Sequence, residues 1–213
     1  MEFQKIDKKM FEYLGHLYYG PVDYKDLPWE EYITQPDSDW QFPIVQLEYW
    51  KKVFLENIDI IANKTVLDIG CWYGNKIPWF DKLQPTSLTC IDPVPNHIYI
   101  SEYASSLVKT PTTCVTTKAE DYPLVAHTIT MLSMNHNFDD ELAVYDKLQC
   151  KYFILDTWND QKYATSPGKQ SGRLAGSTHY AQARDFLDKK FTLENEDTSL
   201  IPNRVILRYK NKD

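Results

Sequence analysis

The sequence predicts a doubly wound α/β fold whose mostly parallel, seven-stranded sheet ends in a C-terminal antiparallel hairpin. Two observations carry this prediction. From residue 65 onward, short apolar runs alternate with segments long enough for a helix, a rhythm typical of parallel sheets. The last two strand-like runs, 190–197 and 203–210, have no helix between them, so we expect them to pair antiparallel.

The other elements follow in order along the chain. The five earlier strands are predicted at residues 65–69, 87–91, 112–117, 127–133 and 151–157. Helices are predicted at residues 75–83, 95–109, 138–148 and 177–190. Asn75 and Asn96 are candidate N-caps of the first two helices, and Pro78 is compatible with the first turn of a helix only.

The first 60 residues have a different character. Residues 20–43 are rich in proline, aromatic and acidic residues, and residues 45–58 have the apolar spacing of a helix. We therefore predict two parts, an aromatic-rich helical and loop cap at residues 1–60 and an α/β domain at residues 61–213. The aromatic side chains of the cap could cover a ligand site or the outer helices of the domain, and a mixture is favoured.

Composition limits the functions that are possible. The chain has 213 residues and a net charge of −7, which argues against a general electrostatic attraction to nucleic acid. Four widely spaced cysteines without a CxxC pair predict buried free thiols and no metal site. No stretch approaches the ~20 apolar residues of a membrane span, and residues 1–15 lack the apolar core of a signal peptide. We expect a cytoplasmic protein.

Chemistry-bearing residues follow the first two predicted strands. Asp68 and Gly70 end the first strand, and Gly74 lies near the start of the following helix. Asp92 ends the second strand roughly 20 residues later, where a carboxylate can accept both hydroxyls of a ribose. An aspartate before Pro93 could instead simply begin a turn. Because ligands bind at the carboxyl ends of parallel strands, the pattern favours a nucleoside-type ligand.

Four segments carry a family resemblance: VLDIGCWYG, CIDP, KAEDYP and SMNHNF. In this order and spacing they resemble the class I S-adenosylmethionine-dependent methyltransferases, over residues 46–210. The resemblance implies S-adenosylmethionine as cofactor and the terminal antiparallel strand pair of that fold. It also implies roles for residues at three strand ends: Asp68, Gly70, Cys71 and Gly74 for the methionine part, Asp92 and Pro93 for the ribose, and Ala119 and Glu120 beside the adenine.

The sequence departs from the family pattern at two positions. Trp72 stands where the middle glycine is usual, and Lys118 stands where many members carry an acid. Trp72 has fewer accessible backbone angles than glycine, but Gly70 and Gly74 are retained. We therefore expect a working loop, with the Trp72 ring directed into the helix layer or over the cofactor.

A narrower resemblance involves SDWQF, IDP and SMNHNF, which are similar to the tRNA wobble-uridine carboxymethyltransferase branch. It implies cofactor contacts from Met134 and from an aromatic residue, Phe138. Trp40 in the N-terminal cap is the best candidate there for a cofactor contact. Gln41 replaces the lysine of that branch, so plain S-adenosylmethionine is favoured over a carboxylated cofactor.

The candidate catalytic residues are His136 and Asp156. His136 could act as a general base or form ordinary loop hydrogen bonds, and Asp156 could accept a substrate hydroxyl or amine or cap a turn. The chain lacks the Asn/Asp-Pro-Pro-Tyr pattern of DNA-amine methylation, so DNA is disfavoured as a substrate. We predict a methyltransferase for a small molecule or RNA; the alternatives are a non-catalytic binding or structural module and, less favoured, a dinucleotide-linked oxidoreductase.

Overall fold

The computed structural model describes residues 52–72, 74–132, 138–158, 180–199 and 204–213. The chain divides into two compact units, Met1–Glu56 and Asn57–Asp213. Of the first unit only residues 52–56 are described; they are helical and carry an ion pair between Lys52 and Glu56 at 3.6 Å. The predicted boundary at residue 60 stays a prediction.

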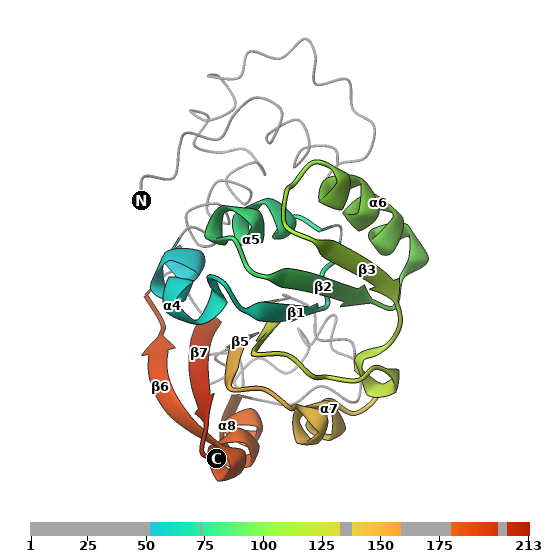
Figure 1. Cartoon of the computed structure of the whole chain (residues 1–213). Coiled ribbons are helices and arrows are strands. Elements are labelled where there is room, and N and C mark those ends of the chain that lie inside the picture. Colours follow the sequence, from blue (N-terminus) through green and yellow to red (C-terminus); the bar gives the residue numbers. More distant parts are fainter. Residues whose placement is uncertain (1–51, 73, 133–137, 159–179, 200–203) are drawn as a thin grey trace, which may run out of the picture. The chain divides into compact units, whose positions relative to one another are not determined.

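The second unit contains a seven-stranded sheet of order β3-β2-β1-β4-β5-β7-β6 (Figure 1). The strands are β1 Thr65–Ile69, β2 Ser87–Asp92, β3 Thr112–Thr116, β4 Thr128–Met131, β5 Tyr152–Trp158, β6 Phe191–Asp197 and β7 Arg204–Asn211. Neighbours among β1 to β5 pair parallel, whereas β7 runs antiparallel to both β5 and β6. The predicted fold class is confirmed.

The helices among the described residues of this unit are α4 Ile58–Ile61, α5 Ile77–Leu83, α6 Pro95–Ser106, the 3-10 turn η2 Ala119–Asp121, α7 Glu141–Lys147 and α8 Tyr180–Lys190. The N-cap residues of α5 and α6 are Lys76 and Val94, so the predicted Asn75 and Asn96 caps were wrong. In both α5 and α6 a proline lies in the first two helical positions and sets the start of the helix, because proline has a helical φ and needs no amide partner there.

The two faces of the sheet differ in chemistry because successive side chains along a strand point to opposite faces. Figure 1 shows α5 and α6 on one side of the sheet and α7 and α8 on the other. Apolar residues dominate the side of α7 and α8, among them Leu67, Ile129, Phe153, Leu155, Leu187, Phe191 and Tyr209. The opposite face also buries apolar residues, among them Val66, Leu88 and Ile154. One register row on that face carries polar and thiol side chains: Cys114, Cys90, Asp68 and Thr130.

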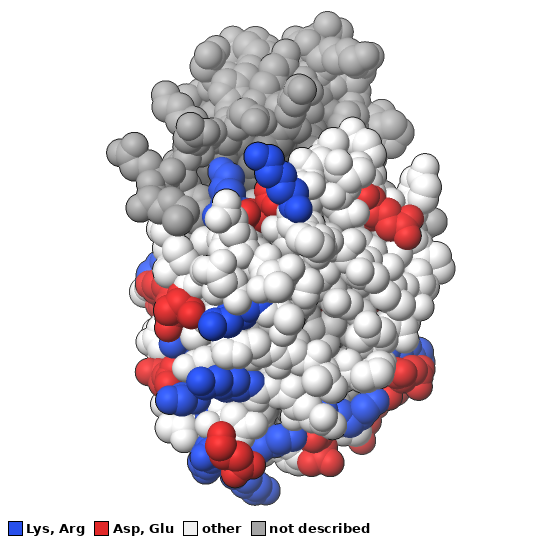
Figure 2. All heavy atoms as spheres, viewed as in Figure 1, with Lys and Arg blue, Asp and Glu red and all other residues white. Residues whose placement is uncertain are grey.

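The surface is mixed in charge where it is visible. On the face in Figure 2, lysine and arginine side chains lie among acidic ones. In the part of the chain that the structure describes, no helix is long and apolar enough to cross a membrane.

Candidate functional site

Three described residues of the loop after β1 have a left-handed backbone conformation. The φ angles are 67° at Gly70, 51° at Trp72 and 71° at Gly74. For tryptophan this conformation costs roughly 1–2 kcal/mol, because its Cβ crowds the following carbonyl oxygen. At Gly74 glycine is also needed for packing, since an added Cβ would lie 2.8 Å from Ile77 Cδ1 and 2.9 Å from Ser101 Cα of α6. The loop is therefore held closely against α6.

The amide groups of this loop bond within the protein. Gly70 and Cys71 both donate to the carbonyl oxygen of Ile91, at 2.9 and 3.1 Å, and Gly74 donates to the carbonyl oxygen of Cys71 at 3.0 Å. Trp72 donates its amide to Asp92 Oδ2 at 3.1 Å. A ligand would therefore compete with existing bonds for these four N–H groups.

Asp92 is the point where the ends of β1 and β2 meet. Its carboxylate is buried and accepts three hydrogen bonds: Oδ2 from Trp72, and Oδ1 from the Val94 amide and from His97 Nδ1, both at 2.9 Å. The His97 ring also lies edge-on to the Trp72 ring, with centroids 6.4 Å apart. A carboxylate has about four acceptor sites, so three of them are in use.

The sequence reasoning missed His97 and Ser101, which bind the same loop from α6. Ser101 Oγ lies 2.9 Å from the carbonyl oxygens of both Trp72 and His97. The signal was available for His97, because it follows Asp92 by five residues at the start of a predicted helix. For Ser101 no local signal existed, since its partner Trp72 is 29 residues away.

A second buried carboxylate, Asp68, is satisfied by a lysine that the sequence reasoning also missed. Lys76 Nζ lies 2.9 Å from Asp68 Oδ2 and donates to the carbonyl oxygen of Gly70 at 3.2 Å. Thr130 donates to the other carboxylate oxygen at 2.8 Å. Burial raises the pKa of Asp68, and Lys76 and Thr130 oppose that rise. The pair is nearly inaccessible to water, with side-chain exposures of 2% and 1%.

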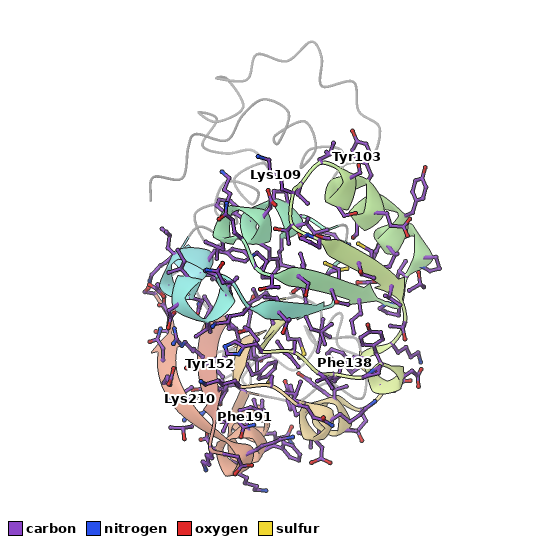
Figure 3. All side chains as sticks on the ribbon, in the orientation of Figure 1. Tyr103, Lys109, Phe138, Tyr152, Phe191 and Lys210 are labelled. Atoms are coloured by element: carbon purple, nitrogen blue, oxygen red, sulfur yellow. The ribbon has the colours of Figure 1, made fainter. Side chains whose placement is uncertain are left out.

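The turn after β3 is anchored to the segment after β4. Ala119 is buried in the apolar core, while Glu120 accepts the Asp139 amide at 3.0 Å. Lys118, which departs from the family pattern, forms an exposed ion pair with Asp139 at 2.6 Å. Phe138, labelled in Figure 3, packs against the apolar core from the side of α7.

The structure describes some of the remaining predicted site residues and leaves others outside the described ranges. Pro93 is exposed beside Asp92, and the Cys71 thiol is buried 3.8 Å from Ser101 Oγ. Asp156 is fully buried in β5 and follows Ile154, the register partner of Thr130, by two residues. Three candidates lie outside the described residues: Trp40, Met134 and His136. The structure thus brings Gly70, Cys71, Trp72, Gly74, Asp92 and Pro93 together at one sheet edge.

Metal coordination has no support in the described residues, where no group of three or more His, Cys, Asp or Glu side chains is arranged to hold an ion.

Comparison with solved structures identifies the class of fold, which is that of the class I S-adenosylmethionine-dependent methyltransferases. Magnesium protoporphyrin IX methyltransferase (ChlM) from Synechocystis PCC 6803, solved with bound S-adenosylhomocysteine (SAH), is 13% identical, with a TM-score of 0.65 over 96% of this chain and 100% of that one. The N-methyltransferase NodS from Bradyrhizobium japonicum WM9 is 16% identical, with a TM-score of 0.61 over 79% of this chain and 97% of that one.

A third structure, an S-adenosylmethionine-dependent methyltransferase from Mesorhizobium loti, is 10% identical, with a TM-score of 0.61 over 75% of this chain and 96% of that one. No family model and no curated protein matches the sequence. At such identities the similarity establishes the fold, and the narrower resemblance to the carboxymethyltransferase branch stays a prediction.

Proposed function

We propose that this chain is an S-adenosylmethionine-dependent methyltransferase acting on a small molecule or RNA. The observation that carries the proposal is the buried Asp92 carboxylate at the end of β2, bonded to the loop that ends β1. An acid in this position of a parallel sheet can accept the hydroxyls of a ribose. Solved structures of the same fold hold S-adenosylmethionine or SAH.

The strand-end residues can bind the cofactor only if Asp92 gives up one of its present hydrogen bonds. Asp92 already accepts three hydrogen bonds, so binding two ribose hydroxyls requires the release of at least one. His97 is the donor that can leave by side-chain rotation, whereas the amides of Trp72 and Val94 are fixed by the backbone. We therefore assign Asp92 to the ribose, the Gly70 loop to the methionine part, and the Ala119–Glu120 turn to the adenine.

The chemistry asks little of the protein. When bound, the cofactor supplies an electrophilic methyl group on its sulfonium. The chain must hold the acceptor atom in line with that methyl group and, for some acceptors, remove a proton. We propose His136 as the base and Asp156 as a group that orients the acceptor.

A specific set of contacts favours a second function, a non-catalytic module with this fold. The amides of Gly70, Cys71, Trp72 and Gly74 all donate hydrogen bonds within the protein. The Lys76 ammonium group pairs with the Asp68 carboxylate and donates to the Gly70 carbonyl oxygen. Such a loop is complete without a ligand. This alternative predicts that the strand ends bind no nucleoside cofactor.

Isothermal titration calorimetry on the full chain separates the two functions. We expect SAH to bind with a dissociation constant in the micromolar range, about −8 kcal/mol, and NAD not to bind. If SAH gives no heat and also fails to raise the melting temperature, the methyltransferase proposal is abandoned in favour of the non-catalytic module.

Asp92→Ala tests the ribose assignment against a matched control. Loss of a charged acceptor should weaken SAH binding roughly tenfold to a hundredfold. Because Asp92 accepts three hydrogen bonds, the variant should also lose folding stability. Asp81→Ala is the control, because Asp81 Oδ1 accepts the amides of Lys109 and Thr110 at 2.9 and 2.7 Å but belongs to helix α5.

The control should lose comparable stability and keep the parent's affinity. If Asp92→Ala binds SAH as tightly as Asp81→Ala does, Asp92 is not a ribose ligand. If the parent binds SAH, the methyl acceptor can be sought by incubating the protein and S-adenosylmethionine with panels of small metabolites and tRNA and measuring the release of SAH.

A further inference from the structure

Three of the four cysteines gather on the face of the sheet that α6 covers. Cys90 of β2 and Cys114 of β3 are direct partners in the parallel register. Cys71 follows β1 and approaches Ser101 of α6. Sulfur atoms are visible between these strands and α6 in Figure 3.

The three thiols differ in their access to solvent. Cys71 and Cys90 are both completely buried, whereas Cys114 lies on the edge strand β3 and is half-buried. The Cys90 thiol interacts with Cys114 on one side and with Cys71 on the other. A reagent from solvent therefore reaches Cys114 first and finds a second thiol directly behind it.

The surroundings of Cys114 favour the reactive thiolate form. A hydrogen bond with Cys90 lowers the pKa of the Cys114 thiol, and Ser105 of α6 acts in the same direction. Burial and the negative charge of Glu102 oppose the shift but do not reverse it. Oxidant-sensitive cysteines combine these properties, namely a lowered pKa, partial exposure and a neighbouring thiol that can resolve the product.

We propose that Cys114 and Cys90 form an oxidant-responsive thiol pair, with hydrogen peroxide as the class of oxidant. The Cys114 thiolate attacks one peroxide oxygen, the O–O bond breaks, and a sulfenic acid and hydroxide form. The Cys90 sulfur then displaces the hydroxyl of that sulfenic acid, which leaves as water. In total, two thiols and one peroxide become one disulfide and two waters.

The sheet geometry suits this link. Neighbouring strands lie about 4.7–4.9 Å apart, within the roughly 4.4–6.8 Å between Cα atoms that a disulfide spans. Register partners also point to the same face, so both sulfur atoms lie under α6. The link would lie two residues before Asp92 on β2 and two before Thr116 on β3, directly behind the candidate cofactor site.

Cys150 provides a matched control within the chain. It is also buried and free, but it lies in the apolar core, where burial raises the pKa of its thiol to about 12. Because each pKa unit changes the thiolate fraction about tenfold, we expect Cys114 to oxidise at least about a hundredfold faster than Cys150.

The experiment treats the full reduced chain with hydrogen peroxide and maps its peptides without reduction. A Cys90–Cys114 disulfide is expected in the parent. In Cys90→Ser, the Cys114 sulfenic acid should accumulate and be trapped by dimedone, a reagent specific for sulfenic acids. Cys150→Ser should behave as the parent does.

Two results would overturn the proposal. One is oxidation of Cys150 as fast as that of Cys114; the other is a persistent Cys114 sulfenic acid in the parent, which would remove Cys90 as the resolving thiol. Mapping of the parent needs no substitution, so the test remains decisive even if Cys90→Ser folds poorly.

Discussion

Both faces of the one sheet bury apolar side chains, but only one of them also buries charged groups and a pair of thiols. The apolar face, towards α7 and α8, packs aliphatic and aromatic side chains such as Leu155, Phe153 and Phe191. The polar face, towards α5 and α6, also buries apolar side chains such as Val66, Leu88 and Ile154. In addition it buries Asp68 with Lys76 and places Cys90 beside Cys114. Apolar burial stabilises a fold whatever the details of its partners, whereas a buried charge is tolerated only with its own partner. The polar face therefore depends on particular pairs in addition to its apolar burial, and it adjoins the candidate site.

Lys76→Met should give the largest effect, because it leaves the Asp68 carboxylate buried without its cation. We expect a loss of about 3–5 kcal/mol in the free energy of unfolding, measured by urea denaturation at pH 7. The double variant Asp68→Leu/Lys76→Met should recover most of that loss, since it removes both buried charges. If the single variant loses under about 1 kcal/mol, the polar face does not depend on this pair.

Leu155→Ala tests the apolar face. Leu155 is fully buried in β5 between Met131 of β4 and Leu207 of β7, so its truncation leaves a cavity. We expect a loss of about 3 kcal/mol in unfolding free energy, with SAH affinity unchanged. Leu107→Ala is the control, because that leucine is 63% exposed, and it should change stability by less than about 0.5 kcal/mol. Equal losses in both variants would contradict the packing described for this face.

Alkaline pH should lower the free energy of unfolding, because Cys150 in the apolar face keeps its proton in the folded state. Burial raises the pKa of its thiol from 9.0 to about 12, so the folded state keeps the proton while the unfolded state loses it. Stability conferred by the neutral thiol is complete below pH 9 and is lost as pH rises towards 12. At pH 10.5 the loss should be about 2 kcal/mol, and Cys150→Ala should lack this part of the pH dependence. Identical pH profiles for parent and variant would exclude the effect.

Trp72→Gly should have the smallest effect on stability, because two contributions oppose each other. Glycine relieves the left-handed strain at φ 51°, but it removes the contact with the His97 ring and adds freedom to the unfolded chain. We expect a net change within about 1 kcal/mol in the free energy of unfolding and retained SAH binding.

Trp72→Ala sharpens this test, since alanine loses the ring and keeps most of the strain. It should be about 1 kcal/mol less stable than Trp72→Gly. Equal stability of the two variants would mean that the left-handed conformation at this position costs nothing.

Sequence prediction succeeded where the signal is local. All seven strands and their residue ranges were recognised within a few residues, because apolar alternation and turn residues act over neighbouring positions. It failed at the N-caps of α5 and α6, where Asn75 and Asn96 are common capping types but Pro78 and Pro95 decided the first turn. The roles of all the site residues stay predictions, and Trp40, Met134 and His136 lie outside the described residues.

The sequence by itself determined the fold class and the residues that end β1 and β2, since both follow from patterns within short segments. Tertiary structure alone decided the partners: Asp68 with Thr130, Asp92 with the Trp72 amide, and Cys90 with Cys114. These residues are 20 to 62 positions apart in the chain, and each pair exists because β1 lies between β2 and β4, and β2 beside β3. Strand order arises from packing of the whole sheet and its helices, and no local pattern of residues encodes it.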